Sequence, residues 1–227
     1  MKNRSFIVIR QLLTGVLIIM IISSCKKKED SITVTDIDGN VYKTVIIGTQ
    51  TWLKESLKTT KYSNGDPIPD VTSGTQWQSL TSGAYCNYDN DHGFTDTYGL
   101  LYNWHAVKDP KNICPAGWHV PSDSEWTTLI DFLGGEDVAG GKLKEKGTGH
   151  WISPNTGATD SYGFTARPAG YRFGGIFNQP GYYAIWWTST QKDLNDAWII
   201  SLINSKTQSY LEYAYKTDGF SVRCLKD

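Results

Sequence analysis

The sequence predicts an α+β domain, in which an antiparallel sheet of N- and C-terminal strands is combined with two or three short helices and long loops. Three observations predict this class. A β-hairpin pattern opens the folded part, short apolar segments at helical spacing occupy the middle, and closely spaced strand-like segments end the chain. Because strands lie at both ends, we expect the N-terminal hairpin to join the C-terminal sheet.

The N-terminal hairpin is predicted from β-branched residues on both sides of a turn. Residues 32–35 form its first strand and residues 41–47 its second. Asp38 and Gly39 between them favour a tight turn. The same residues resemble the start of an EF-hand calcium loop, but that loop needs a glycine at position six and a glutamate at position twelve. Neither is in place here, so the spacing favours a turn.

The middle of the chain combines long loops with two predicted helices. Residues 61–98 are rich in small polar residues and interrupted by aromatic ones, which indicates ordered loops. Residues 100–107 carry apolar side chains at helical spacing. A second helix begins at Ser122, which can cap the free amides while Glu125 reaches back to the Ser122 amide. We expect it to end at residues 134–135, two consecutive glycines.

The C-terminal part contains four strand-like segments, separated by Asp, Asn, Lys and Gly. They span residues 182–190, 197–203, 208–215 and 220–225. Short spacing of this kind predicts an antiparallel meander.

Residues 1–24 have the features of a signal peptide. Basic residues precede an uncharged apolar segment, residues 12–22, which is short for a helix that spans a bilayer. The tetrad Ile22-Ser23-Ser24-Cys25 resembles the lipobox of bacterial lipoproteins, and this resemblance implies cleavage before Cys25 and lipid attachment to it. Residues 25–31 then form the lipidated cysteine and a charged tether, and residues 32–227 form a single domain. A transmembrane anchor that ends in cysteine is the alternative.

Charge excludes some partners and suggests a location. Three of the 22 basic residues and none of the 23 acidic ones fall in residues 1–24, so 19 basic and 23 acidic residues remain after cleavage. This formal balance of −4 does not favour a nucleic-acid partner. The charged run of residues 26–30 resembles the motif after the lipidated cysteine in surface-exposed lipoproteins of Bacteroidetes-type bacteria. The resemblance implies a lipid anchor in the cell envelope, at the outer membrane and facing outward.

Six segments together resemble the Fibrobacter succinogenes major paralogous domain, a family of exported bacterial domains. They are Asp-Ile-Asp-Gly-Asn-Val-Tyr at 36–42, Ile-Gly-Thr-Gln-Thr-Trp at 47–52, Tyr-Gly-Leu-Leu-Tyr-Asn-Trp at 98–104, Cys-Pro-Ala-Gly-Trp-His-Val-Pro-Ser at 114–122, Trp-Trp-Thr-Ser-Thr at 186–190 and Ser-Val-Arg-Cys at 221–224. The sequence departs from the family pattern at Ser56, Arg167 and Ala169. More distantly, residues 119–126 and 219–224 look like the C-type-lectin-like superfold, which also houses formylglycine-generating enzymes. The resemblance implies an architecture and does not define an activity.

Three cysteines remain besides Cys25, and their spacing does not suggest a zinc site. Export permits a disulfide. In lectin-like folds a cysteine on the helical side commonly bonds one on the last strand, which implies a bond between Cys114 and Cys224. Cys86 competes for either partner, and fully reduced thiols are a further alternative.

Two groups of residues are candidate ligand sites. Trp186 and Trp187 are adjacent, so in a strand they point to opposite faces of the sheet. We expect one of them to be exposed and to stack on a ligand such as a sugar ring. A loop with carboxylate and amide oxygens could hold calcium, although Asx turns explain it equally well. Its residues are Asp89, Asn90, Asp91 and Asp96.

We therefore expect a non-enzymatic binding domain for glycans or other extracellular ligands. The four histidines are scattered, and the sequence lacks a nucleophile elbow, a phosphate loop and a zinc-protease motif. Formylglycine-generating enzymes use a pair of cysteines near the C-terminus, whereas this C-terminal region has only Cys224. A structural cell-envelope protein that acts through protein–protein contacts is the alternative. Calcium is the one cofactor that the sequence suggests.

Overall fold

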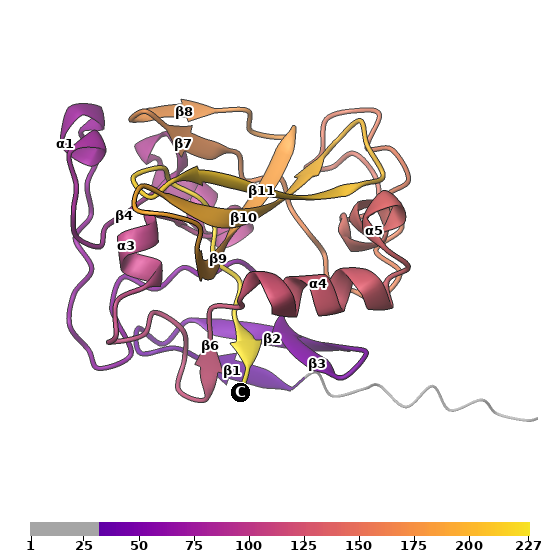
Figure 1. Ribbon diagram of the computed structural model, residues 1–227, viewed down its shortest axis with the longest axis horizontal. Coiled ribbons are helices and arrows are strands. Elements are labelled where there is room, and N and C mark those ends of the chain that lie inside the picture. The colour runs from indigo at the N-terminus through magenta and orange to yellow at the C-terminus, as the bar shows by residue number, and fades with distance from the viewer. Residues whose placement is uncertain (1–31) are drawn as a thin grey trace, which may run out of the picture. The chain divides into compact units, whose positions relative to one another are not determined.

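The computed structural model describes residues 32–227 (Figure 1). The predicted signal peptide, Cys25 and the tether up to residue 31 lie outside the described residues. Within residues 32–227, no helix has both the length and the apolar character needed to cross a membrane. This part of the chain contains antiparallel sheets and a few short helices.

The predicted N-terminal hairpin is present and belongs to a five-stranded sheet. Asp38 and Gly39 lie in its turn, where Gly39 has a φ of 87° and its amide donates to the carbonyl of Asp36 at 3.1 Å. All neighbouring strands of this sheet are antiparallel. Their order is β1 (Thr33–Thr35), β2 (Val41–Ile47), β3 (Gln50–Leu53), β12 (Leu225–Lys226) and β6 (Trp118–His119).

Three of the four predicted C-terminal segments form a second, separate sheet, an antiparallel meander. Its strands are β9 (Tyr183–Gln191), β10 (Asp196–Ile203) and β11 (Ser209–Tyr215), with β10 in the centre. Trp187 pairs with Ile199 on one side of β10, and Trp198 pairs with Tyr213 on the other.

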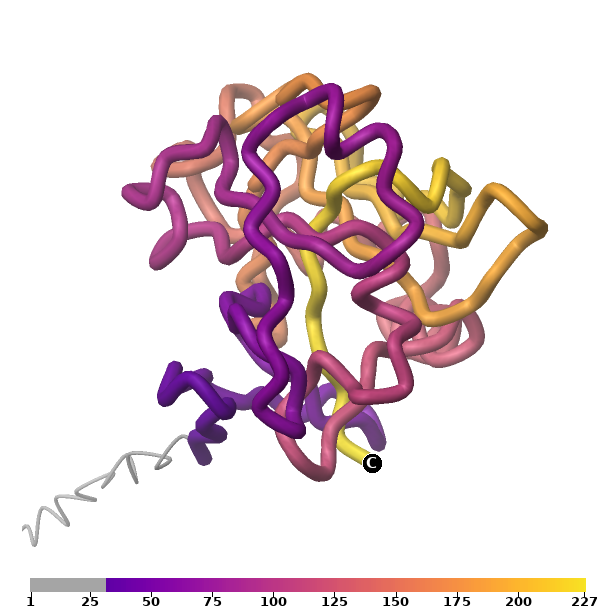
Figure 2. Tube along the Cα trace, turned by 90° about the vertical axis from the view of Figure 1, so that its left-hand side faces the viewer, coloured from indigo at the N-terminus to yellow at the C-terminus, as the bar shows by residue number. Residues whose placement is uncertain are grey.

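The predicted fourth strand, residues 220–225, does not continue the meander. Phe220 forms an isolated bridge with Tyr102, and Ser221 forms one with Trp186. The chain then reaches the other sheet, where β12 pairs with β3 and β6. The expectation that the N-terminal hairpin joins the sheet of the C-terminal meander was therefore wrong, and of the C-terminal strands only β12 shares a sheet with the hairpin. The apolar residues of segment 220–225 are buried in the core instead of extending an edge of the meander. In Figure 2 this yellow segment runs down through the domain to the C-terminus.

The predicted capped helix is α4 (Asp123–Phe132). Ser122 Oγ accepts the amide of Glu125, and the Glu125 carboxylate accepts the amide of Ser122, so the capping box is complete. A further helix, α5 (Glu136–Leu143), follows directly after Gly135 and was not predicted. Both helices pack on the meander from the same side (Figure 1).

The other predicted helix is shorter than expected. It is α3 (Trp104–Val107), because Asn103 caps it by accepting the amide of Ala106 at 3.1 Å. The preceding residues form β5 (Leu101–Tyr102), which pairs with β4 (Tyr85–Cys86). The remaining short elements are α1 (Gly74–Gln78), the 3₁₀ turns Tyr88–Asn90 and His92–Phe94, α2 (Thr95–Tyr98), β7 (Tyr171–Phe173) and β8 (Ile176–Asn178).

Candidate functional site

The structure does not place Trp186 or Trp187 at the surface. Their side chains are 1% and 0% exposed, so the prediction that one of them is accessible was wrong. The two do point to opposite faces of β9, since Trp186 joins the core beneath α4 and Trp187 joins the core between the sheets. Both faces of the sheet are covered at this point. Neither ring can therefore stack on a ligand.

The predicted calcium residues have separate partners. The Asp91 carboxylate accepts the amide of Gly93 at 2.8 Å, as in an Asx turn. Asp96 pairs with Lys58 at 2.9 Å, and the side chain of Asn90 donates to the carbonyl of Thr72. Asp89 is exposed and has a φ of 53°. Within residues 32–227, no three side chains of the His, Cys, Asp or Glu type are arranged to hold a metal ion. These residues therefore do not form the expected site.

An open pocket of about 300 Å³ lies at the C-terminal end of β11. It is lined by four aromatic residues, two aspartates and an alanine, which are Phe173, Tyr213, Tyr215, Phe220, Asp196, Asp218 and Ala214. Tyr213 and Tyr215 are 56% and 57% exposed, and Phe173 is 52% exposed. β11 is an edge strand, since only β10 pairs with it in its sheet. We call this the β11 pocket.

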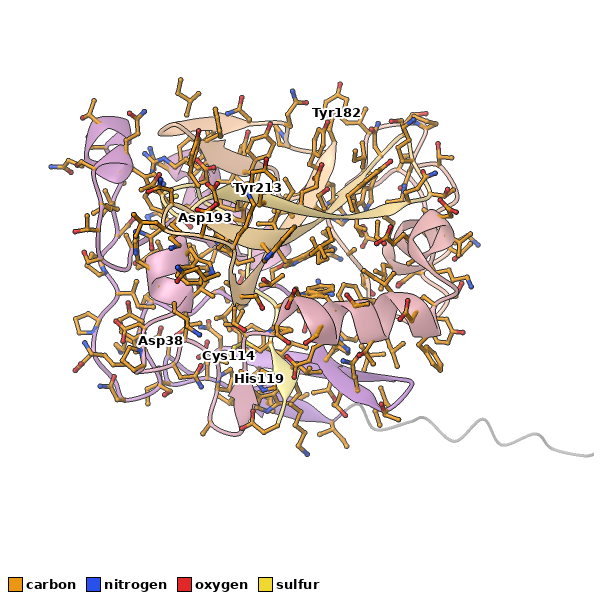
Figure 3. The ribbon with its side chains drawn as sticks, in the orientation of Figure 1. Asp38, Cys114, His119, Tyr182, Asp193 and Tyr213 are labelled. Carbon is orange, nitrogen blue, oxygen red and sulfur yellow. A yellow bond between two sulfur atoms is a disulfide. The ribbon has the colours of Figure 1, made fainter. Side chains whose placement is uncertain are left out.

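Tyr213 is held in place by its neighbours. The Nζ of Lys192 lies 3.2 Å from the centroid of the Tyr213 ring, and the Trp198 ring meets Tyr213 edge-on with centroids 6.1 Å apart. Lys192 also pairs with Asp196, at 3.8 Å. Figure 3 shows Tyr213 at the same end of the sheet as Asp193, while Tyr182 lies elsewhere on the surface. The ring is thus exposed but restrained.

The two carboxylates of the β11 pocket differ in environment. Asp218 is buried, and burial raises its pKa to about 7 although the amides of Gly174 and Tyr215 act in the opposite direction. Asp196 is only partly buried and carries the charge that pairs with Lys192. The pocket therefore combines exposed aromatic faces with hydrogen-bond acceptors, the combination that suits a flat ligand with apolar faces and hydroxyl edges.

The Fibrobacter succinogenes major domain model matches residues 45–226. No curated protein and no solved structure matches the chain. The chain belongs to the Fibrobacter succinogenes major domain family. The match confirms the resemblance found in the sequence and includes the β11 pocket, whereas β1 precedes it.

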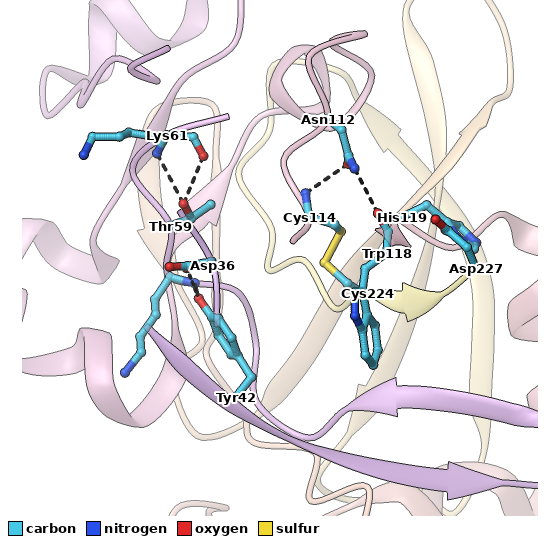
Figure 4. The surroundings of a disulfide bond; sticks show 11 residues. Asp36, Tyr42, Thr59, Lys61, Asn112, Cys114, Trp118, His119, Cys224 and Asp227 are labelled. Atoms are coloured by element: carbon cyan, nitrogen blue, oxygen red, sulfur yellow. Dashed lines mark hydrogen bonds and ion pairs between the residues drawn. A yellow bond between two sulfur atoms is a disulfide. The ribbon is translucent and has the colours of Figure 1, made fainter. Parts of the chain in front are cut away.

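This Fibrobacter succinogenes major domain contains the disulfide that the lectin-like resemblance implied, between Cys114 and Cys224, whose α-carbons lie 6.0 Å apart (Figure 4). Asn112 positions Cys114, because its side chain accepts the Cys114 amide and donates to the carbonyl of Trp118. Cys86 is free and buried, and burial raises the pKa of its thiol to about 12. The bond joins the segment before β6 to the segment before β12.

Sequence reasoning missed the tyrosines of the β11 pocket in this domain. Tyr213 and Tyr215 alternate with Ala214 along the strand, so the sequence places both rings on one face. It does not show which part of that face the helices leave uncovered. The alternation in the sequence therefore indicated that the two tyrosines share a face, but it did not indicate that they are exposed beside a pocket.

Proposed function

We propose that this protein is an exported, lipid-anchored, non-enzymatic binding module whose ligands are extracellular glycans. The observation that carries the proposal is the β11 pocket, in which Phe173, Tyr213 and Tyr215 are exposed beside Asp196 and Asp218. Aromatic faces pack on the C–H faces of sugar rings, and carboxylates accept hydrogen bonds from sugar hydroxyls. The long surface loops of the family domain are a common setting for binding sites.

We also propose a C-type-lectin-like arrangement for the domain. The features that support it are the capped helix α4, which packs against β9 and β10, and the disulfide that ties the helical part to the last strand. The proposal concerns architecture, and the glycan proposal does not depend on it.

A glycan-array screen of the purified full chain, kept in detergent, tests the function. We expect binding to a restricted set of glycans and loss of that binding in the double variant Tyr213→Ala/Tyr215→Ala. Tyr182→Ala is the matched control, because Tyr182 is also an exposed tyrosine but does not line the β11 pocket. An array on which wild type and double variant bind equally would exclude this site.

The lipid anchor is proposed from residues outside the described part of the chain. Cys25→Ser should abolish metabolic labelling by a palmitate analogue and partitioning into detergent. Labelling that persists in this variant would contradict the assignment. Protease shaving of intact cells tests the outward orientation, since a surface-exposed domain is cleaved without cell lysis.

A second candidate, a structural envelope protein that acts through protein contacts, is favoured by a different surface. A groove of about 550 Å³ between the β2–β3 hairpin and α4 exposes Ile46, Phe132 and Tyr162. Exposed apolar surface of this kind is typical of partner interfaces. Cross-linking on cells with a photoreactive residue at position 132 should yield a defined adduct if this candidate is correct, and none if it is not.

A further inference from the structure

Four cationic side chains are buried in the described part of the chain, and three of them donate hydrogen bonds to several backbone carbonyls each. Arg172 donates from Nε, Nη1 and Nη2 to the carbonyls of Gly175, Val71 and Thr72, at 3.1, 2.7 and 2.7 Å. Lys144 lies 2.7–3.4 Å from four carbonyl oxygens. Lys216 donates to two carbonyls. These three groups are satisfied by the fold itself.

Arg223, the fourth, is not satisfied in this way. It is 1% exposed, and within residues 32–227 its hydrogen bonds are limited to one, from Nη1 to the carbonyl of Phe164. Its Nε is buried and donates to no protein acceptor. The described residues also provide no carboxylate in an ion pair with Arg223. A buried charged donor without a partner is costly, so a complementary group is needed.

Aromatic rings fix the flat face of this guanidinium. Its Cζ lies 4.1 Å from the centroid of Phe164 and 5.2 Å from that of Trp186. The rings hold the plane of the group and supply no acceptor in that plane. The edge of the guanidinium is thus the part left for a ligand.

Arg223 lines a polar pocket of about 180 Å³, here called the Arg223 pocket. The other lining residues are Lys43, Lys54, Glu55, Ser56, Thr97, Thr165 and Arg167. Arg167 is paired with Glu145 at 3.0 Å, and Glu55 accepts the amide of Lys43 at 2.9 Å. The ammonium groups of Lys43 and Lys54 have no ion-pair partner among the described residues. The pocket is therefore positively charged.

Two segments that line the Arg223 pocket are held in place by hydrogen bonds, those around Arg223 and Thr165. The residues on either side of Arg223 accept backbone hydrogen bonds, Cys224 from Leu53 at 3.0 Å and Val222 from Leu57 at 2.8 Å. Thr165, which follows the Phe164 carbonyl that Arg223 contacts, has a φ of 56°, which is unusual for a β-branched residue. Asp160 stabilises that conformation by accepting both the amide and the hydroxyl of Thr165. Backbone strain of this kind concentrates at functional sites.

We propose that the Arg223 pocket binds the carboxylate group of an acidic sugar of the uronic-acid type. A guanidinium edge matches two coplanar carboxylate oxygens, and the neighbouring ammonium groups add charge. The hydroxyls of Ser56, Thr97 and Thr165 and the carboxylate of Glu55 provide partners for sugar hydroxyls. The choice of a sugar as the source of the carboxylate rests on the proposed glycan function, but the site is separate from the β11 pocket.

The protonation state of Arg223 is compatible with this role. Burial lowers the pKa of its guanidinium to about 9, and the charges of Glu55 and Asp160 act in the opposite direction. The group is therefore cationic at neutral pH. A bound carboxylate would favour the charged form further.

Calorimetric titration of the full chain in detergent with sodium galacturonate tests the proposal, with galactose as the matched neutral sugar. We expect galacturonate to bind, galactose to bind at least tenfold more weakly, and added sodium chloride to weaken galacturonate binding. Inorganic phosphate, sulfate and glutarate are titrated in parallel. Equal or tighter binding of phosphate or sulfate would overturn the assignment to a carboxylate, and tighter binding of glutarate would overturn the assignment to a sugar.

Variants locate the binding. Arg223→Lys keeps the charge but loses the guanidinium edge, and we expect affinity for galacturonate to fall about tenfold to a hundredfold, the usual range for a charged hydrogen bond. If Arg223→Lys fails to fold, Lys54→Gln decides, because Lys54 is only partly buried. Its matched control is Lys226→Gln, which removes the same charge from an exposed residue outside the pocket. Equal effects of Lys54→Gln and Lys226→Gln would overturn the proposal.

The two proposals fail in different ways. Galacturonate binding that survives Tyr213→Ala/Tyr215→Ala but not Lys54→Gln supports the Arg223 pocket whatever the glycan array shows. If glycan binding on the array depends on the two tyrosines but galacturonate does not bind in the titration, the proposed function is supported and the inference about the Arg223 pocket is overturned.

Discussion

The ammonium group of Lys192 lies over the ring of Tyr213, 3.2 Å from its centroid, although both residues are exposed. The contact joins the turn between β9 and β10 to the edge strand β11, so it restrains the outer wall of the β11 pocket. Lys192 also pairs with Asp193 at 3.5 Å. A surface lysine thus has a defined orientation here.

Replacing this lysine tests the contact. Lys192→Met should lower the free energy of unfolding by about 0.5–1 kcal/mol, the usual size of an exposed cation–π contact. Lys192→Arg should retain most of this stabilisation, because a guanidinium also stacks on tyrosine. Urea denaturation measures both variants. An unchanged unfolding midpoint in Lys192→Met would show that the contact does not contribute to stability.

The capping box of α4 gives a second prediction. Ser122→Ala removes the oxygen that accepts the amide of Glu125 and should destabilise the domain by about 1 kcal/mol. Thr128→Ala, at an exposed position inside the same helix, is the control and should have a smaller effect. Denaturant melts of the two variants provide the comparison. Equal losses would argue against a specific role for the cap.

The disulfide gives a third prediction. The bonded cysteines are 110 residues apart, and closing a loop of about a hundred residues restricts the unfolded chain by on the order of 4–5 kcal/mol in the chain-entropy model. The variant Cys114→Ser/Cys224→Ser should therefore unfold at a much lower denaturant concentration. Cys86→Ala, which leaves the disulfide intact, should lose less stability than the double variant. Peptide mapping without reductant checks the pairing, and a linked peptide that contains Cys86 would contradict it.

The buried carboxyl of Asp218 gives a prediction about pH. Burial raises its pKa from 3.8 to about 7, so between these values the folded state binds more protons than the unfolded state. The contribution of Asp218 to stability is then present below about pH 4 and is lost as the pH rises through about 7. Asp218→Asn should flatten the dependence of stability on pH in this range and should be the more stable protein at pH 8.

Thermal melts across this pH range measure the effect. The control is Asp193→Asn, because Asp193 is exposed and hydrogen bonds from the amides of Asn195 and Asp196 lower its pKa instead of raising it. Parallel curves for Asp218→Asn and the unmodified protein would mean that Asp218 does not titrate in this range.

Local patterns predicted the elements that local chemistry determines. The turn at Asp38–Gly39 and the cap at Ser122 depend on residues a few positions apart, and both are present. The path of residues 220–225 depends on which distant strands offer a free edge, and the sequence does not contain that information. The alternation of Trp186 and Trp187 was predicted correctly, but the covering of both faces follows from the packing of α4 and the other sheet.

The residues of the two candidate sites also differ in how far the sequence alone predicts them. Tyr213 and Tyr215 could be assigned to one face from their spacing, whereas the sequence does not show that Arg223 and Arg172 have different hydrogen-bond partners. Both arginines are buried beside aromatic rings, and they differ in how many carbonyl oxygens the surrounding loops bring to them. That number depends on tertiary structure.

The position of β12 has a consequence for the order of assembly. This two-residue strand, Leu225–Lys226, lies between β3 and β6, so the five-stranded sheet cannot form until the chain up to residue 226 is available. Until β12 is in place β3 has an unpaired edge, and such an edge is exposed to other chains, while pairing between distant segments of the chain is slow.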